Sequence, residues 1–230
     1  MHDDHGTTAG IAPGCRVKSA TRSRVLLAAF SLLCAIGLLL EFRVSILRAA
    51  GWALVVDDPL VASDVIVVPH WTGEAGALEA ADLVRAGLAP RVAVLVGPRA
   101  RAETEIVRRQ ILTPETSIWL TRLTRSLGVQ TVEEIPNPIN GTGAEGELLP
   151  DWSVLHGFHS IIVVSTSDHS RRVRRVLHRS MKGRDINVIV RSARYSGFEP
   201  DRWWHTRDGA RTEIVELQKL LFDIVRYPIS

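Results

Sequence analysis

Cysteine is scarce in this chain of 230 residues, which contains only Cys15 and Cys34. Both cysteines precede the part of the sequence that is predicted to fold as a domain. A disulfide framework and a CxxC metal site are therefore excluded from that domain. The lack of disulfides is compatible with any compartment, including an extracytoplasmic one.

A strong charge imbalance and several signature motifs are also lacking. The formal net charge is only +3, which is too small to argue for nucleic acid as a partner. There is no GxGxxG, P-loop, GxSxG or HExxH motif, so dinucleotide, nucleotide triphosphate, α/β-hydrolase and zinc protease functions lack their signatures. The histidines show no metal-ligand spacing, so no metal site is predicted, and the sequence identifies no cofactor.

A long apolar run is present near the N-terminus. It follows residues 1–24, which are mostly polar and aperiodic and are expected to form a disordered tail. From Val25 to Leu40 the chain has no charged residue, and Phe42, Val44 and Ile46 extend the apolar character to residue 47. A buried helix of a soluble protein normally keeps a polar face, which this run lacks.

Two membrane-related interpretations remain for the apolar run. A cleaved signal peptide needs a small-residue cleavage site, and the RAAGWA sequence over 48–53 is a poor one. A transmembrane signal-anchor over 25–47 is favoured, because about 20 apolar residues span a bilayer. Basic residues are more frequent before the run than after it. We therefore expect a cytoplasmic tail, a single-pass anchor in the plasma membrane and an extracytoplasmic domain over 50–230.

The rest of the chain alternates short apolar runs with helical periodicities. Buried strands are predicted over 65–68, 91–97, 160–166 and 186–193, with a further short strand over 116–120, while the region 121–139 is ambiguous. Helices are predicted over 73–89, 101–112, 142–157, 168–181 and 206–227. Continuously apolar strands separated by helices predict an α/β, Rossmann-like fold with a mainly parallel sheet and helices on both faces.

Small hydroxyl residues end the most hydrophobic predicted strand. Ser165, Thr166 and Ser167 lead into Asp168 and His169, and an arginine-rich helix follows. Ligands of parallel α/β proteins bind beyond the carboxyl ends of the strands, and a helix N-terminus attracts anions there. A simpler alternative is that Ser167 or Asp168 only caps the helix.

The arginines of this helix can serve a phosphate or simply face solvent. Helical spacing predicts one side with Arg171, Arg174, Arg175 and His178, and another side with Arg172 and Arg179. Two guanidinium groups on one side can meet on a phosphate. Alternatively, the arginines form a solvated face or touch anionic lipid headgroups.

Two further strand ends carry candidate residues. Gly97 follows the second strand, where a glycine permits close approach of a ligand to the backbone. Thr142 and Glu145 begin a predicted helix, and their spacing favours a capping box over a ligand site.

The C-terminal segment contributes another set. Trp203 and Trp204 either stack on a ligand or fill the core, and we expect the core for one of them. Glu213, Glu216 and Lys219 share a face of the last predicted helix, which is typical of a surface ion-pair ladder.

Together these motifs resemble the DUF218 family of bacterial envelope proteins, also called the ElyC/SanA/YdcF family, over roughly residues 50–226. The resemblance rests on DPLVASDVIVV, ADLVRAGLAPRVAVLVG, INGTGAEGELL, IIVVSTSDHSRRVRRV and DRWWHTRDGARTEIVELQK. It implies a Rossmann-like fold behind an N-terminal membrane helix and a role in envelope or peptidoglycan processes. The positions that match the family are Thr142, Glu145, Ser165, Thr166, His169, Arg172, Trp204, Glu216 and Lys219.

Two turns depart from the family pattern. The glycine-rich turn after the first strand is replaced by Pro69-His70-Trp71, and the Ser-Gly-Gly turn after the second is replaced by Val96-Gly97-Pro98. The bulk of Trp71 and the rigidity of Pro98 are expected to narrow the ligand pocket.

The leading hypothesis is a membrane-anchored protein that binds a phosphorylated or lipid-linked envelope precursor, and the sequence leaves open whether it also processes that precursor as an enzyme. Arg172 and the helix N-terminus would hold the phosphate. His169 would act as general acid or base, with Glu145 or Glu216 orienting it. The alternatives are a non-catalytic envelope scaffold and an S-adenosylmethionine-binding protein, since binding of that molecule is proposed for some members of the family.

Overall fold

The computed structural model describes residues 17–111, 116–139 and 141–228. The chain divides into two compact units, residues 1–46 and 47–230. Most of helix α1 (Val17–Leu54) belongs to the first unit. Of the predicted tail over 1–24, residues 1–16 lie outside the described residues, and residues 17–24 belong to α1.

The first unit presents apolar side chains to its surroundings. Leu26, Phe30 and Leu33 are exposed, as are most other described apolar residues of this part of α1. Among the described residues, no single helix is both long and apolar enough to cross a bilayer. Two stretches of α1 on either side of a bend, Arg24–Leu38 and Leu40–Leu54, meet the length and composition requirement only as a pair.

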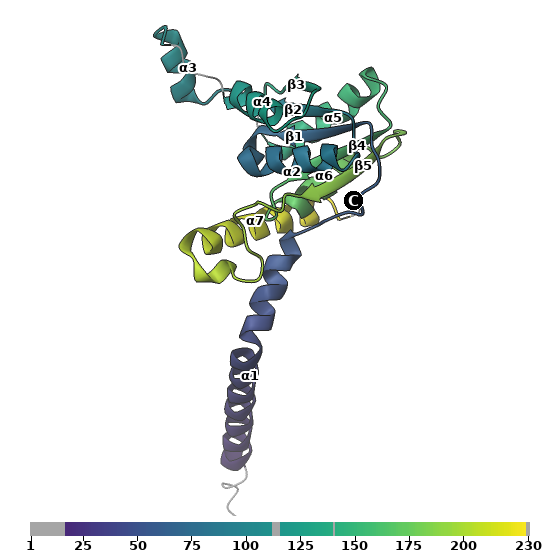
Figure 1. Cartoon of the computed structure of the whole chain (residues 1–230). Helices are drawn as coiled ribbons and strands as arrows, with labels where there is room; N and C mark the ends of the chain where they lie inside the picture. Colours follow the sequence, from purple (N-terminus) through teal and green to yellow (C-terminus); the bar gives the residue numbers. More distant parts are fainter. Residues whose placement is uncertain (1–16, 112–115, 140, 229–230) are drawn as a thin grey trace, which may run out of the picture. The chain divides into compact units, whose positions relative to one another are not determined.

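Five parallel strands form the sheet of the second unit (Figure 1). They are β1 (Val65–Pro69), β2 (Val92–Val96), β3 (Val132–Pro136), β4 (Ser160–Ser165) and β5 (Asn187–Ser192). The order is β3-β2-β1-β4-β5, and every pairing is parallel. The predicted Rossmann-like α/β fold with a parallel sheet is thus confirmed. The chain moves outward from β1 to β3 and then returns to β4 on the other side of β1, so the strand order reverses between β1 and β4.

Helices cover both faces of the sheet. Ile66 and Val68 of β1 share one core cluster with residues of α2 (Gly73–Arg85) and α4 (Thr116–Ser126). Val65 and Val67 point to the opposite face, where α5 (Thr142–Leu155) and α6 (Ser170–Ser180) cover them. Successive side chains of a strand alternate between faces, so a strand buried on both sides must be apolar throughout.

The remaining elements are short, or lie outside these two layers. They are α3 (Arg101–Arg108), the 3-10 helices η1 (His70–Thr72) and η2 (Trp203–His205), and the C-terminal helix α7 (Arg207–Arg226). A third core cluster joins Leu54, at the end of α1, to Phe198 and to Leu220 of α7.

One predicted element is wrong. The segment predicted as a strand over 116–120 begins helix α4, and the ambiguous region 121–139 contains the rest of α4 and strand β3. Leu120, Leu123 and Leu127 recur at helical spacing and pack against the core cluster that contains α2. A short apolar run does not distinguish a buried strand from the start of a buried helix, and the leucines beyond residue 120 decide it.

A buried carboxylate fastens α2 to the end of β5. Glu79 is fully buried, and its oxygens accept hydrogen bonds from Arg191 Nε (2.9 Å) and from Arg194 N (3.1 Å) and Nε (3.0 Å). Removing one partner of a buried ion pair leaves the other charge without compensation, at a cost of about 3–5 kcal/mol.

We therefore expect Glu79→Ala to lower the free energy of unfolding by about 3–5 kcal/mol, measured by urea denaturation of the full chain in detergent solution. Glu74→Ala, at an exposed position in the first turn of the same helix, serves as the control and should change it by less than about 1 kcal/mol. Equal effects of the two substitutions would contradict the role of Glu79.

Candidate functional site

A cavity of about 450 Å³ opens beside β1 and β4 at their carboxyl ends. It is lined by His70, Trp71, Gly141, Thr142, Glu145, Thr166, Asp168, His169, Arg172, Glu216 and Lys219. These residues come from the segments that follow β1 and β4, from the start of α5, from α6 and from α7. The place where the strand order reverses is where open parallel α/β sheets bind their ligands.

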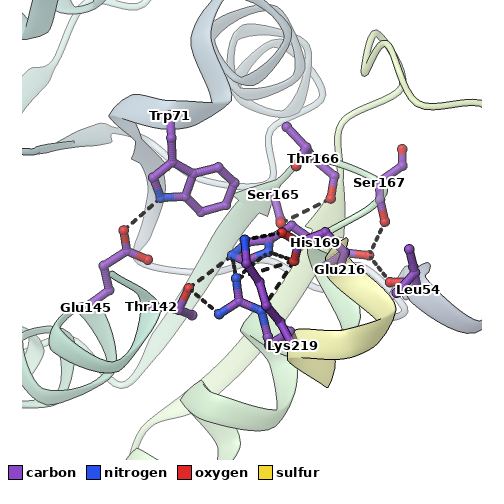
Figure 2. A network of polar contacts seen from close by, with 12 residues as sticks. Leu54, Trp71, Thr142, Glu145, Ser165, Thr166, Ser167, His169, Glu216 and Lys219 are labelled. Carbon is purple, nitrogen blue, oxygen red and sulfur yellow. Dashed lines mark hydrogen bonds and ion pairs between the residues drawn. The ribbon is translucent and has the colours of Figure 1, made fainter. Parts of the chain in front are cut away.

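A hydroxyl, an imidazole and a carboxylate form a chain of hydrogen-bond contacts inside this cavity. The Thr142 Oγ1 is 3.0 Å from the His169 Nε2, and the His169 Nδ1 is 2.9 Å from the Glu216 Oε2. Figure 2 shows the three side chains pointing toward one another from α5, from the residue before α6 and from α7. All three residues are buried, with Thr142 6%, His169 9% and Glu216 8% exposed. When Nδ1–H donates to Glu216, Nε2 is the acceptor of the ring, and the Thr142 hydroxyl and Arg172 Nη2 are both within donor distance of it.

Two cations surround these three side chains. Arg172 Nη1 donates to the Thr142 Oγ1 at 3.0 Å, and Arg172 Nη2 lies within 3.1 Å of both ring nitrogens of His169. Lys219 Nζ donates to the Glu216 Oε1 at 2.7 Å. One carboxylate therefore has an imidazole and two cations around it.

Glu216 is held in its charged form. Burial alone would raise the pKa of Glu216, but the hydrogen bonds from His169 and Lys219, together with the charges of His169 and Arg172, outweigh burial and lower the pKa to about 2. A carboxylate that stays ionised in this way can orient an imidazole and stabilise the positive charge that forms on it.

A second carboxyl behaves in the opposite way. Glu145 accepts a hydrogen bond from Trp71 Nε1 at 2.7 Å, and the Trp71 ring packs edge-on against the His169 ring at 4.8 Å between centroids. Burial raises the pKa of Glu145, and the hydrogen bond from Trp71 offsets this only in part. Two carboxyls with pKa values shifted in opposite directions flank one histidine, an arrangement typical of acid–base sites.

The structure brings most of the predicted site residues together. Thr142, Glu145, Thr166, His169, Arg172, Glu216 and Lys219 all line the cavity. Ser165, Ser167, Gly97 and Trp204 are not among its lining residues.

The serines on either side of Thr166 serve the fold. Ser165 Oγ donates to the backbone carbonyl of Thr166, and Ser167 Oγ accepts a hydrogen bond from Ser192 Oγ at 2.9 Å. Trp204 packs against Trp203 and His205, while Trp203 joins the cluster of Leu54 and donates to the carbonyl of Leu47. Both tryptophans are half-buried, and Trp203 is the one that packs against a core cluster, the small one around Leu54.

The space above Gly97 is occupied by the side chain of His70 and is not open to a ligand. A Cβ atom at position 97 would lie 2.1 Å from the His70 ring, so that imidazole occupies the space above the glycine. His70 and Trp71, which follow β1 at the point of reversal, both line the cavity. The sequence placed Trp71 at the pocket but gave His70 no role in it. Trp71 lines the cavity, whereas Pro98 is not among the lining residues.

Both predicted helix caps are wrong. The residue before α5 is Gly141, and α5 has no side-chain cap, because the Thr142 hydroxyl bonds to His169 and Arg172 and Glu145 bonds to Trp71. The residue before α6 is His169, also without a side-chain cap, so neither Ser167 nor Asp168 has the predicted role. Partners from distant segments bond to the side chains of Thr142, Glu145 and Ser167, which local spacing assigned to caps.

Most arginines of α6 hold neighbouring elements together. Arg171 donates to the carbonyls of Trp52, Ala53 and Val55 at the end of α1, and Arg174 pairs with Asp58. Cations at a helix C-terminus satisfy carbonyls that have no partner within the helix.

Arg175 and Arg179 both pair with Asp223 of α7, at 2.8 and 3.2 Å. The predicted grouping of Arg175 with Arg171 and Arg174 is therefore wrong, because Asp223 draws it to the side of Arg179. Of the five arginines, only Arg172 lines the cavity of His169.

A second cavity of similar volume, about 450 Å³, shares Arg172 and Lys219 with the first. Its other lining residues are Gly143, Val176, Arg179, Gln218, Phe222, Asp223, Arg226 and Tyr227. The lining contains the cations Arg172, Arg179, Lys219 and Arg226 but only one carboxylate. The second cavity thus has an excess of positive charge and an aromatic rim.

Comparisons with known proteins leave the family open. No protein-family model matches the chain, and no curated protein matches it. Among solved structures, guanylylpyridinol- and ATP-bound HcgE from Methanothermobacter marburgensis is similar at 18% identity and a TM-score of 0.32. The match covers 59% of this chain and 62% of that chain, so this chain spans less than two thirds of the length of HcgE. A likeness at this level carries no argument about function.

A buried carboxyl beneath the site does not belong to the predicted surface ladder. Glu213 is fully buried, and neither of its oxygens has a hydrogen-bond partner among the described residues. Burial and the nearby charge of Asp168 raise its pKa to about 7. Only Glu216 and Lys219 form the ion pair that was predicted for this face.

A raised carboxyl pKa makes stability depend on pH. The contribution of Glu213 is fully present below its ordinary pKa of 4.5 and is lost as the pH rises through about 7, because a buried unpaired charge then forms. We expect Glu213→Gln to raise the free energy of unfolding by about 1–3 kcal/mol at pH 8 and to change it little at pH 4.5, measured by urea denaturation.

The exposed Glu147, changed to Gln, is the control for this measurement and should show no such difference between the two pH values. An effect of Glu213→Gln that is the same at pH 4.5 and at pH 8 would show that the carboxyl is not protonated in the folded protein.

Proposed function

We propose that this chain is a membrane-anchored envelope protein of the DUF218 type, whose α/β domain binds and processes a phosphorylated envelope precursor. The observation that carries the proposal is the pair of cations, Arg172 and Lys219, at the junction of two cavities beside the imidazole of His169. A guanidinium group binds phosphate in bidentate fashion and an ammonium group binds it as a point charge.

The charge of the two cavities suggests how such a ligand lies. The cavity of His169 contains the carboxyl groups of Glu145, Asp168 and Glu216, which offset its cations. The second cavity has an excess of cations. A phosphate at the junction would contact Arg172 and Lys219, the reacting bond would face His169, and further acidic groups would lie toward Arg179 and Arg226.

The side chains around His169 have matching roles in acid–base chemistry. Glu216 orients the imidazole through Nδ1, and Nε2 is the atom that exchanges a proton. Glu145, with its raised pKa, is a candidate proton donor to a leaving group on the Trp71 side of the cavity.

The binding proposal is tested with inorganic pyrophosphate and the full chain, by calorimetric titration. We expect binding to weaken at least about tenfold in Arg172→Ala and in Lys219→Ala, because each removes a charge-assisted hydrogen bond. Arg174→Ala is the matched control, since Arg174 pairs with Asp58 and lines neither cavity.

Lys219 is half exposed, so its substitution reports on binding even where Arg172→Ala unfolds the protein. Absence of pyrophosphate binding by the wild-type chain would overturn the phosphate proposal and favour the second candidate, a non-catalytic envelope scaffold. The observation that favours the scaffold is that Arg171, Arg174, Arg175 and Arg179 are all engaged by carbonyls or carboxylates of the same chain.

The membrane anchor over residues 25–47 is a separate part of the proposal. It is supported by the exposed apolar side chains along α1, such as Leu33 and Ile36. We expect the wild-type chain to stay with membranes during carbonate extraction, and Leu33→Arg combined with Ile36→Arg to move it to the soluble fraction. Each arginine costs about 2.5–3.5 kcal/mol at the centre of a membrane helix.

Val61→Arg, at an exposed apolar position of the second unit, is the control and should leave the chain in the membrane fraction. Extraction of the wild-type chain by carbonate, or retention of the double variant, would contradict the anchor.

A further inference from the structure

The hydroxyl of Thr142 is available for chemistry because the helix it begins does not use it. The residue before α5 is Gly141, whose φ of 117° lies where an L side chain is strained, and α5 has no side-chain cap. This turn delivers Thr142 into the cavity at the first position of α5, where its hydroxyl contacts His169 and Arg172 and is 6% exposed.

The hydrogen bonds around this hydroxyl are those of an activated nucleophile. Arg172 Nη1 donates to Oγ1, and the hydroxyl proton points to the His169 Nε2 when Nδ1–H donates to Glu216. The oxygen then keeps one lone pair free for attack. A hydroxyl next to a base, with the base oriented by a third group, is the recurring signature of covalent catalysis.

We propose that Thr142 is the nucleophile of the reaction and accepts the phosphoryl group in a covalent intermediate. This inference rests on the proposed function, because it takes the phosphorylated molecule bound at Arg172 and Lys219 as its substrate. In this inference Thr142 is a catalytic residue and does more than contact the ligand. In the first step His169 removes the proton of the Thr142 hydroxyl, and not a proton of water.

The first step exchanges one P–O bond for another. The Thr142 Oγ1 attacks phosphorus as its hydroxyl proton passes to the His169 Nε2. The bond from phosphorus to the leaving-group oxygen breaks on the opposite side, where protonated Glu145 donates a proton to that oxygen. Arg172 stabilises the negative charge that develops on Oγ1 and on the phosphoryl oxygens. Glu216 compensates the positive charge on the imidazole.

The second step restores the enzyme. A water molecule attacks the phosphorus of phosphothreonine from the side that the leaving group vacated and gives a proton to the Glu145 carboxylate. The bond from phosphorus to Oγ1 breaks, and the His169 Nε2 returns its proton to Oγ1. The products are inorganic phosphate and the dephosphorylated alcohol, so the net reaction is hydrolysis of a phosphate ester, with water as the co-reactant.

The test uses diisopropyl fluorophosphate, which phosphorylates activated hydroxyls. Attack by Oγ1 forms an O–P bond, breaks the P–F bond and releases fluoride, while the hydroxyl proton leaves through His169. We expect the full wild-type chain to gain one diisopropylphosphoryl group, and peptide mass spectrometry to place it on Thr142. Labelling should be about 100-fold slower in His169→Ala, as expected for loss of a general base.

Three variants at threonine positions complete the experiment. Thr142→Val should not be labelled, and Thr142→Ser should be labelled at position 142, because serine retains the hydroxyl. Thr121→Val is the matched control: Thr121 is also buried and donates to a carboxylate, that of Glu134, but it does not line the cavity. It should be labelled on Thr142 like the wild type.

The results separate this inference from the proposed function. A wild-type chain that binds pyrophosphate but gains no label on Thr142, or is labelled elsewhere, overturns the nucleophile and leaves phosphate binding standing. Labelling of Thr142 that is equally fast in His169→Ala also overturns it, because the hydroxyl would then not depend on the imidazole. Label on Thr142 without pyrophosphate binding supports the nucleophile and contradicts the phosphorylated substrate.

Discussion

The carboxylate of Glu216 is the group on which the arrangement of the site depends. It accepts from His169 before α6 and from Lys219 one turn along α7, and it lies 3.4 Å from Arg172 of α6. Arg172 in turn reaches Thr142 at the start of α5. Three helices distant in sequence are thus joined by one buried negative charge, which stays ionised because its partners outweigh its burial.

Much of the fold can be predicted from the sequence, because the strands of a parallel sheet covered on both faces have a recognisable hydrophobic pattern. Runs such as Val65–Val68 and Ile161–Val164 are apolar without alternation, and only a strand with a helix on each side buries every residue of such a run. This pattern gives the wrong prediction for the segment 116–120, which begins helix α4. The segment is too short to show whether its apolar residues follow a strand or a helix period. What decides that segment is the helical spacing of the leucines beyond it, Leu123 and Leu127, which pack with Leu120 against the core cluster that contains α2.

Most residues of the candidate site can be predicted from the sequence, but the hydrogen bonds between them cannot. The segments around Thr142, His169 and Glu216 each carry a local interpretation, as a cap, a helix start and an ion-pair ladder. The structure replaces the cap with contacts to His169 and Arg172, and it adds a contact between His169 and Glu216, while Glu216 keeps its ion pair with Lys219. The arginines of α6 show the reverse, since their number suggested a phosphate site while most of them hold α1, Asp58 and Asp223. A polar side chain with several partners within reach forms its hydrogen bonds with the strongest partner that the tertiary fold supplies. The spacing of residues along one helix does not reveal that partner.

The imidazole of His70 lies over Gly97, so it links the residues that directly follow two neighbouring strands, β1 and β2. Position 97 has no room for even one methyl group while the His70 ring is in place. The next residue after His70 is Trp71, and both line the cavity. Among homologous chains, a side chain at 97 and an imidazole at 70 should therefore exclude each other. A chain with a small residue at position 70 would leave the space above position 97 open, so we expect the residues at these two positions to vary together.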